Sequence, residues 1–227
     1  MKIWTSEHVF DHAWDTVVQA AWRKYPNPHN PSVTAIDVMD RSVTEEGVMR
    51  SNRLFRGDWS IPAWATSLVG LDNPTYAYEY SEVDPRKKRM FLRTVNLNCL
   101  NYMSIEETLS YKPHPENSHK TLLEQSTVIT VRGVPLVSYM ESLLASIFTA
   151  NTQKGRQAME WVIGNIKHEY QELSSKLSSE YQELSHKLSS EYDGLSQKLA
   201  TEYEELQQNV RRESEKFLGQ QHSQARS

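Results

Sequence analysis

The sequence predicts an α+β fold: a seven-stranded curved antiparallel sheet folded around a long C-terminal helix, with a helical 11-residue-repeat segment behind it. Three observations support this prediction. A strand-like segment and a short amphipathic helix open the chain, six strand-like segments with mostly short connections follow, and helical periodicity covers the rest. Short connections favour antiparallel neighbours, because a parallel crossover needs about a dozen residues or more. We expect an elongated cavity between helix and sheet.

The chain begins with a strand and a helix whose buried face is clear from its spacing. Residues 2–10 have the composition of a strand, and Asp11 is a suitable N-cap for the helix that follows. Apolar residues then recur at helical spacing, at Trp14, Val17, Val18, Ala21, Trp22 and Tyr25. Pro26 ends this helix, since the residue before a proline is disfavoured in helical geometry. The prolines of KYPNPHNPS fix a sharp path into the sheet at Val33.

The sheet and the long helix come next in the sequence. The further strands are expected at residues 33–43, 49–56, 75–83, 89–98, 101–112 and 121–132, separated by turn signals. One connection is long, from Gly57 to Pro74, and it carries two tryptophans. Pro135 is a favoured first helical residue. The apolar spacing after it predicts a helix that covers the sheet.

Residues 167–227 have a different pattern, an internal repeat. Units of eleven residues begin at Glu169, Glu180, Glu191 and Glu202. Each unit places Tyr, then Leu three residues later, then Leu or Val seven residues later, which makes one narrow apolar stripe. We therefore expect one helix from 167 to about 217, and a domain boundary between 1–166 and 167–227.

The role of this repeat helix stays open at the level of sequence. A coiled coil with a partner, including self-association with a second copy, and packing along the first domain both fit a narrow stripe. A lipid surface fits less well, because the segment has few lysines and a net charge of −3. A solvated helix without a specific role is the remaining alternative.

Composition and motifs exclude several classes of function. Lys and Arg total 25 against 29 Asp and Glu, a balance that does not suggest a nucleic-acid binder. The single cysteine, Cys99, rules out an internal disulfide and a multi-cysteine metal site. No apolar run approaches a membrane span, and the N-terminus resembles neither a presequence nor a signal peptide, so we expect a soluble chain made in the cytosol. Hydrolase, kinase and dinucleotide motifs are absent, so no catalytic residue, cofactor or metal is expected.

Isolated cations in apolar surroundings are the remaining candidates for a site. They are Lys24, Arg53, Arg93, Lys154 and Arg156. Cations that project into an apolar cavity can bind the phosphate of an amphiphile while the walls hold its tails. Each of them can equally be a surface charge or a member of a local ion pair.

Five segments together resemble one known family. MKIWTSEHVF, KYPNPHNPSV, SEVDPRKKRM, YKPHPENSHKTLL and KGRQAMEWVI are similar to segments of the PRELI/MSF1 family, specifically its Slowmo branch (PRELI domain-containing protein 3), across residues 1–166. The resemblance implies a phospholipid transfer protein of the mitochondrial intermembrane space, whose seven-stranded sheet and helices enclose one lipid. It also implies import without a cleaved presequence and a small helical twin-CX9C partner protein. The Slowmo branch implies phosphatidylserine as the lipid; the alternative is phosphatidic acid.

The resemblance also assigns residues. Lys24, Arg53 and Lys154 occupy the positions of the family's basic ligand-binding residues. Within the long connection, the family's lid loop, Ile61, Trp64 and Leu68 are expected to touch an anionic membrane. Two positions depart from relatives: Ser32 stands where some relatives have His, and Gly57, with Arg56 beside it, stands where the phosphatidic-acid branch has Lys.

These assignments lead to a mechanism and to a rival. The lid opens at the membrane, one phospholipid enters, and Lys24, Arg53 and Lys154 neutralise its phosphate without covalent chemistry. An Arg53→Glu substitution is then expected to abolish transfer and leave folding intact. The rival is a non-transfer interaction protein that acts through a coiled coil of the repeat segment.

Overall fold

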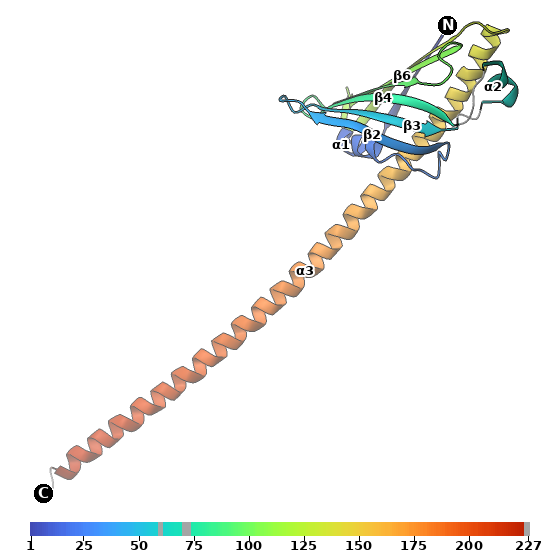
Figure 1. Ribbon diagram of the computed structural model, residues 1–227. Coiled ribbons are helices and arrows are strands. Elements are labelled where there is room, and N and C mark those ends of the chain that lie inside the picture. The colour runs from blue at the N-terminus through green and yellow to red at the C-terminus, as the bar shows by residue number, and fades with distance from the viewer. Residues whose placement is uncertain (59–60, 70–73, 225–227) are drawn as a thin grey trace. The chain divides into compact units, whose positions relative to one another are not determined.

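The computed structural model describes residues 1–58, 61–69 and 74–224 (Figure 1). The chain divides into two compact units, Met1–Lys167 and His168–Ser227. We call the first unit the head and the second the tail, and describe each by itself.

The head contains one antiparallel sheet of seven strands, in the order β1-β7-β6-β5-β4-β3-β2, which confirms the predicted number of strands and their antiparallel pairing (Figure 1). The pairing of β1 with β7 was not predicted. Its strands are β1 Lys2–Phe10, β2 Val33–Val43, β3 Met49–Gly57, β4 Thr75–Asp84, β5 Arg89–Asn96, β6 Met103–His114 and β7 Asn117–Val131. The turn between β6 and β7 is shorter than the sequence indicated. Strand pairing continues through Pro113 to His114, with a register irregularity between those two residues.

Helix α1, Trp14–Trp22, differs from its prediction at both ends. Its N-cap is Ala13, without a side-chain hydrogen bond, so the expectation that Asp11 caps it was wrong. It ends at Trp22, before Tyr25, and the backbone N–H of the C-cap residue Arg23 is shared between the carbonyl oxygens of Gln19 and Ala20, at 3.2 and 3.1 Å. The residues between this early end and Pro26 therefore leave the helix.

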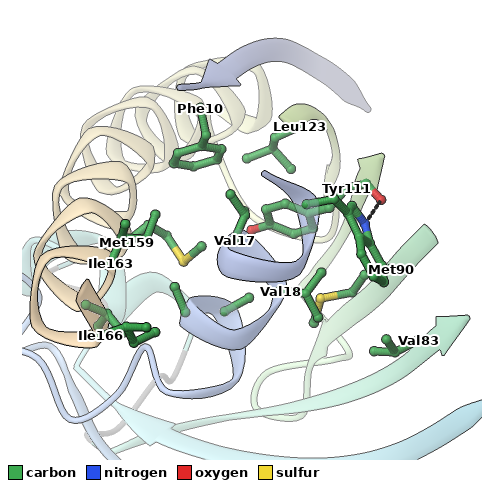
Figure 2. Close-up of a cluster of buried hydrophobic side chains, with 14 of the residues drawn as sticks. Phe10, Val17, Val18, Val83, Met90, Tyr111, Leu123, Met159, Ile163 and Ile166 are labelled. Atoms are coloured by element: carbon green, nitrogen blue, oxygen red, sulfur yellow. Dashed lines mark hydrogen bonds between the residues drawn. The ribbon is translucent and has the colours of Figure 1, made fainter. Parts of the chain in front are cut away.

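The larger core cluster of the head joins α1, the sheet and the long helix α3 (Figure 2). Figure 2 shows Phe10, Val17, Met159 and Ile163 gathered together, and each is at most 1% exposed. The indole N–H of Trp14 donates to the carbonyl oxygen of Tyr111 at 3.1 Å, so α1 is also tied to β6 by a polar contact. Fully burying one such apolar side chain is worth about 1.5–3 kcal/mol.

A second core cluster lies under a helix that the sequence did not reveal. The long connection contains α2, Ala63–Val69. Ala65 is fully buried against a cluster that includes Met140 and Leu144 of α3, and Ile61 is partly buried beside it. Helix α2 is thereby docked on the head.

Helix α3 runs from Val137 to Gln224 without interruption, so the long helix and the repeat segment are one element. It begins two residues after Pro135, because Leu136 adopts a positive φ of 61°. In the tail its apolar stripe is exposed at every repeat, between 61% and 74%: Tyr170, Leu173, Leu177, Tyr181, Leu184, Leu188, Tyr192, Leu195, Leu199, Tyr203, Leu206 and Val210.

Candidate binding site

The head encloses a main cavity of about 200 Å³, lined by residues of both the sheet and α3. A second cavity of about 140 Å³ shares part of this lining. Apolar side chains that line the main cavity include Phe55, Leu92, Ile105, Leu109, Leu144 and Phe148. Charged side chains are also present, and their partners decide what the cavities can bind.

Lys24 lines both cavities. The early end of α1 turns its side chain toward α3, where a Cβ on Gly155 would lie only 3.1 Å from the Lys24 ammonium nitrogen. That nitrogen also lies 5.3 Å from the centre of the Tyr25 ring, a cation–π distance. Burial alone would lower the pKa of Lys24, but nearby Tyr25, Tyr111 and Glu107 reverse this effect and raise the pKa. The ammonium is therefore charged at neutral pH.

Arg53 also lines the main cavity, but it already has an anionic partner. It faces Glu79 across β3 and β4, and its Nε and Nη2 donate to Glu79 Oε1 at 2.8 and 2.6 Å. Both residues are buried, and the guanidinium lies over the rings of Trp22 and Phe55, at 4.7 and 5.1 Å. Burial raises the pKa of Glu79, against the opposing charge of Arg53. Much of the Arg53 charge is therefore satisfied within the protein.

Glu107 of β6 lines both cavities and supplies another carboxylate, besides that of Glu79, to the lining of the main cavity. Its Oε1 accepts a hydrogen bond from Gln125 Nε2 of β7 at 2.6 Å. Burial raises the pKa of this carboxyl, while the Gln125 hydrogen bond and the Lys24 charge act in the opposite direction. Burial also raises the pKa of the neighbouring Tyr111 to about 12, so its phenol is neutral at physiological pH.

The two cations of the KGR sequence on α3 have different environments. Lys154 is exposed and does not line either cavity, so the structure does not group it with Lys24 and Arg53. Arg156 lines the second cavity instead. Its Nη2 donates to Ser6 Oγ at 3.0 Å, its Nε is buried without a hydrogen-bond partner, and burial lowers its pKa. Arg93 lies on the outer face of β5, where it pairs with Glu106 at 2.7 Å.

The three predicted lid residues are placed as follows. Ile61 lines the main cavity, just before α2. Trp64 is 45% exposed, and its ring lies 5.8 Å from the ring of Tyr139, at the start of α3. The side chain of Leu68 lies outside the described residues. Ile61 and Trp64 thus lie on the cavity side and the solvent side of the same short segment.

Comparison with known proteins identifies the family. Residues 15–169 match the PRELI-like family. The chain is 32% identical to "Protein slowmo homolog" of Dictyostelium discoideum over 169 residues, which cover 74% of each protein. It is also 32% identical to "Protein UPS2, mitochondrial" of Saccharomyces cerevisiae over 183 residues, 79% of this chain and 80% of the relative. The chain belongs to the PRELI-like family. The family predicted from the five sequence segments is therefore confirmed.

The fold of this PRELI-like chain is found in distant proteins as well. A crystal structure of TTHA0849 from Thermus thermophilus superposes with a TM-score of 0.51 at 12% identity, over 73% of this chain and 99% of the other. At that identity the likeness concerns the fold alone. In the described ranges, no helix is both long and apolar enough to cross a membrane. Nor do the described residues group three or more His, Cys, Asp or Glu side chains for a metal ion.

Ser32 and Gly57, the two positions at which the sequence resemblance predicts a departure from some relatives, lie side by side. Ser32 and Gly57 both line the main cavity. A Cβ on Gly57 would lie 2.5 Å from the carbonyl oxygen of Ser32, a distance that requires the backbone to move. A lysine at position 57 therefore does not fit this backbone, and the neighbouring cation that lines the cavity is Arg56.

Sequence reasoning missed Glu79, Glu107 and Asn30, although alternation carried a weak signal for the first two. On β4 the buried positions alternate through Ala77, Glu79 and Ser81, while the tyrosines between them are only half-buried. Small and polar residues on the inner face leave room for a cavity, whereas large ones would fill it. Asn30 lies in the proline-rich connection, where no periodicity marks its burial.

Proposed function

We propose that this chain carries one phospholipid at a time between the mitochondrial outer and inner membranes, through the intermembrane space, and that phosphatidylserine is its cargo. The observation that carries the proposal is the charged ammonium of Lys24 in a cavity whose lining also includes apolar side chains such as Phe55, Leu92 and Phe148. An apolar wall with few polar groups is typical of sites for amphiphilic ligands. The family and the mitochondrial relative support the compartment.

The proposed mechanism is binding and release, with no bond made or broken. The lipid phosphate contacts Lys24, Arg53 adds a charge that Glu79 moderates, and Lys154 meets the headgroup outside the cavity. The main cavity has a volume of about 200 Å³, below the ~300–1,000 Å³ of most ligand pockets. Two acyl chains therefore need a larger cavity than this conformation provides. Displacement of Ile61 and α2 at an anionic membrane supplies that room. A small helical twin-CX9C protein is the proposed soluble partner.

A liposome transfer assay tests this function. The full chain, co-expressed with a twin-CX9C partner, is given donor vesicles with labelled phosphatidylserine or phosphatidic acid. Lys24→Met is expected to lower transfer about tenfold or more, as loss of a charge-assisted contact predicts. Lys87→Met is the matched control, because Lys87 is 81% exposed in a surface turn. No transfer by a folded complex contradicts the proposal, and preferential phosphatidic acid transfer supports the alternative cargo.

A second candidate function, self-association through the tail, is favoured by the exposed stripe. Twelve apolar side chains at a constant period of eleven stay exposed, although soluble proteins rarely leave so continuous a strip uncovered. A second copy presents the same period and can cover the stripe along its whole length. The acidic charge of the segment disfavours an anionic lipid surface.

Sedimentation of the full chain tests self-association with matched variants. Leu177→Lys/Leu188→Lys places two charges on the stripe and is expected to give a monomer. Ser179→Lys/Ser190→Lys adds the same charges about 200° around the helix, and is expected to assemble like wild type. A wild-type chain that sediments as a monomer at high concentration removes this candidate.

A further inference from the structure

The charges that line the main cavity are balanced. Lys24, Arg53 and Arg56 supply three cations, and Asp58, Glu79 and Glu107 supply three carboxylates. A phosphate monoester carries a charge of about −1.5 to −2 near neutral pH. It would bring that charge next to two carboxylates that burial already penalises. The balance instead suits a ligand that carries charges of both signs.

Two of the side chains that line the second cavity with Glu107 each have a buried polar atom with no hydrogen-bond partner among the described residues. Asn30 is 7% exposed, and its Nδ2 donates to the Tyr25 hydroxyl at 2.9 Å, but its Oδ1 accepts no hydrogen bond. The Nε–H group of Arg156 is a buried donor that likewise has no hydrogen-bond partner among the described residues. Both residues line the second cavity, with Lys24 and Glu107. Because buried polar atoms are nearly always hydrogen-bonded, an occupant that offers a donor to Asn30 Oδ1 and an acceptor to Arg156 Nε would satisfy both atoms.

We propose that Lys24, Asn30, Glu107 and Arg156 form a headgroup pocket for phospholipids that bear a primary ammonium, and that Glu107 is the residue that selects them. The inference rests on the proposed transfer function and adds the basis of its selectivity. The phosphate lies against Lys24 and Arg156, which supply donors. The ammonium of the headgroup donates to the carboxylate of Glu107 and to Asn30 Oδ1. Phosphatidylserine and phosphatidylethanolamine share this ammonium, whereas phosphatidic acid and phosphatidylglycerol lack it.

The neighbours of Glu107 hold its carboxylate ready for a cation. Gln125 fixes Oε1 from β7, and Lys24 is the facing cation from the α1–β2 connection. Glu79 on β4 is committed to Arg53, and Tyr111 on the same strand as Glu107 is neutral. Because Gln125 occupies one oxygen, an entering ammonium meets a carboxylate that is already oriented.

Relative transfer rates test the role of Glu107. Wild type, Glu107→Gln and Glu106→Gln, each with its partner, are compared on vesicles that contain phosphatidylserine, phosphatidylethanolamine, phosphatidylglycerol or phosphatidic acid. Wild type is expected to favour the two amine-bearing lipids over phosphatidylglycerol by about tenfold. Glu107→Gln is expected to bring this ratio near one, and Glu107→Asp to restore part of it. Glu106→Gln is the matched control, because that carboxylate faces outward, toward Arg93.

The outcomes separate this inference from the proposed function. If wild type transfers none of the four lipids, the transfer function fails. If it transfers them but the ratio is near one, or Glu107→Gln keeps the wild-type ratio, transfer stands and the role of Glu107 is wrong. An Arg156→Gln variant is expected to slow all four lipids equally, because they share the phosphate. A selective loss of the amine-bearing lipids in that variant overturns the placement of the two charges.

Discussion

The head and the tail use similar side chains for opposite purposes. In the head, Phe10, Met159 and Ile163 are at most 1% exposed, and they hold α1 and α3 to the sheet. In the tail, the same helix α3 leaves twelve tyrosines, leucines and a valine more than 60% exposed. The head is therefore stabilised by tertiary burial, whereas the tail by itself depends on local helix energetics. Matched substitutions in the two regions can test this difference.

Ion pairs give the largest expected contrast. Arg53→Met leaves the buried Glu79 carboxylate without its partner, which is expected to destabilise the head by about 3–5 kcal/mol. Lys187→Met breaks a contact of similar length, 2.7 Å to Glu183, but both side chains are 68% exposed and the expected cost is only about 0.3–0.5 kcal/mol. Urea unfolding measures the first and helix melting by circular dichroism the second. All six tryptophans precede the tail, so their fluorescence reports the head alone.

The double variant Arg53→Met/Glu79→Met is the control, since it removes both charges and is expected to recover much of the stability. A cost below about 1 kcal/mol for the single variant would show that water reaches Glu79. The same geometry corrects one expectation from sequence. Arg53→Glu would place two buried carboxylates together, so loss of transfer in that variant reports unfolding, and Lys24→Met is the cleaner test.

Apolar truncations give the next largest contrast. Ile163→Ala removes a side chain that is 1% exposed, and is expected to destabilise the head by about 2–5 kcal/mol. Leu184→Ala removes one that is 67% exposed, and is expected to change the unfolding of the head by less than about 0.5 kcal/mol. Tryptophan fluorescence during urea unfolding measures both. Equal costs would mean that Leu184 is covered by protein in solution.

Periodicity predicted the strands, α1 and α3, but neither α2 nor the partners of the charges in the head. Alternation along a strand and the apolar spacing from Trp14 to Tyr25 indicate which side chains are buried, and both patterns lie within a single segment of the sequence. The Arg53–Glu79 pair depends on the register between β3 and β4, and residues 26 positions apart carry no local signal for it. The same holds for Lys154 and Arg156. They are two residues apart on one helix, and only the packed head shows that Arg156 reaches a cavity.

The contributions of Glu107 and Glu106 to the stability of the head are expected to change with pH in opposite directions. Burial raises the pKa of Glu107 above its ordinary 4.5, so this group favours the folded state at low pH and loses that contribution as pH rises. Glu107→Gln is therefore expected to stabilise the head at neutral pH, and the gain should vanish below about pH 4. Urea unfolding at a series of pH values measures it. A gain that is independent of pH contradicts the assignment.

Glu106→Gln is the control, because its effect on the stability of the head is expected to have the opposite sign. The hydrogen bond from Arg93 lowers the pKa of Glu106, so its contribution is present above the ordinary 4.5 and is lost as pH falls. This substitution is expected to destabilise the head slightly at neutral pH, and the difference should fade in acid.

The last contrast comes from two glycines of α3, and it separates stability from function. Gly194→Ala in the tail meets no atom within 4 Å, and is expected to stabilise the helix by about 1 kcal/mol without altering transfer. Gly155→Ala in the head gains the same helix propensity, but its Cβ would lie 3.1 Å from the Lys24 ammonium nitrogen. The flexible lysine can move away, so stability should change little while transfer falls severalfold. Circular dichroism melting and the transfer assay measure the two effects. Unchanged transfer in Gly155→Ala would show that the position of the Lys24 ammonium against α3 is not what binds the lipid phosphate.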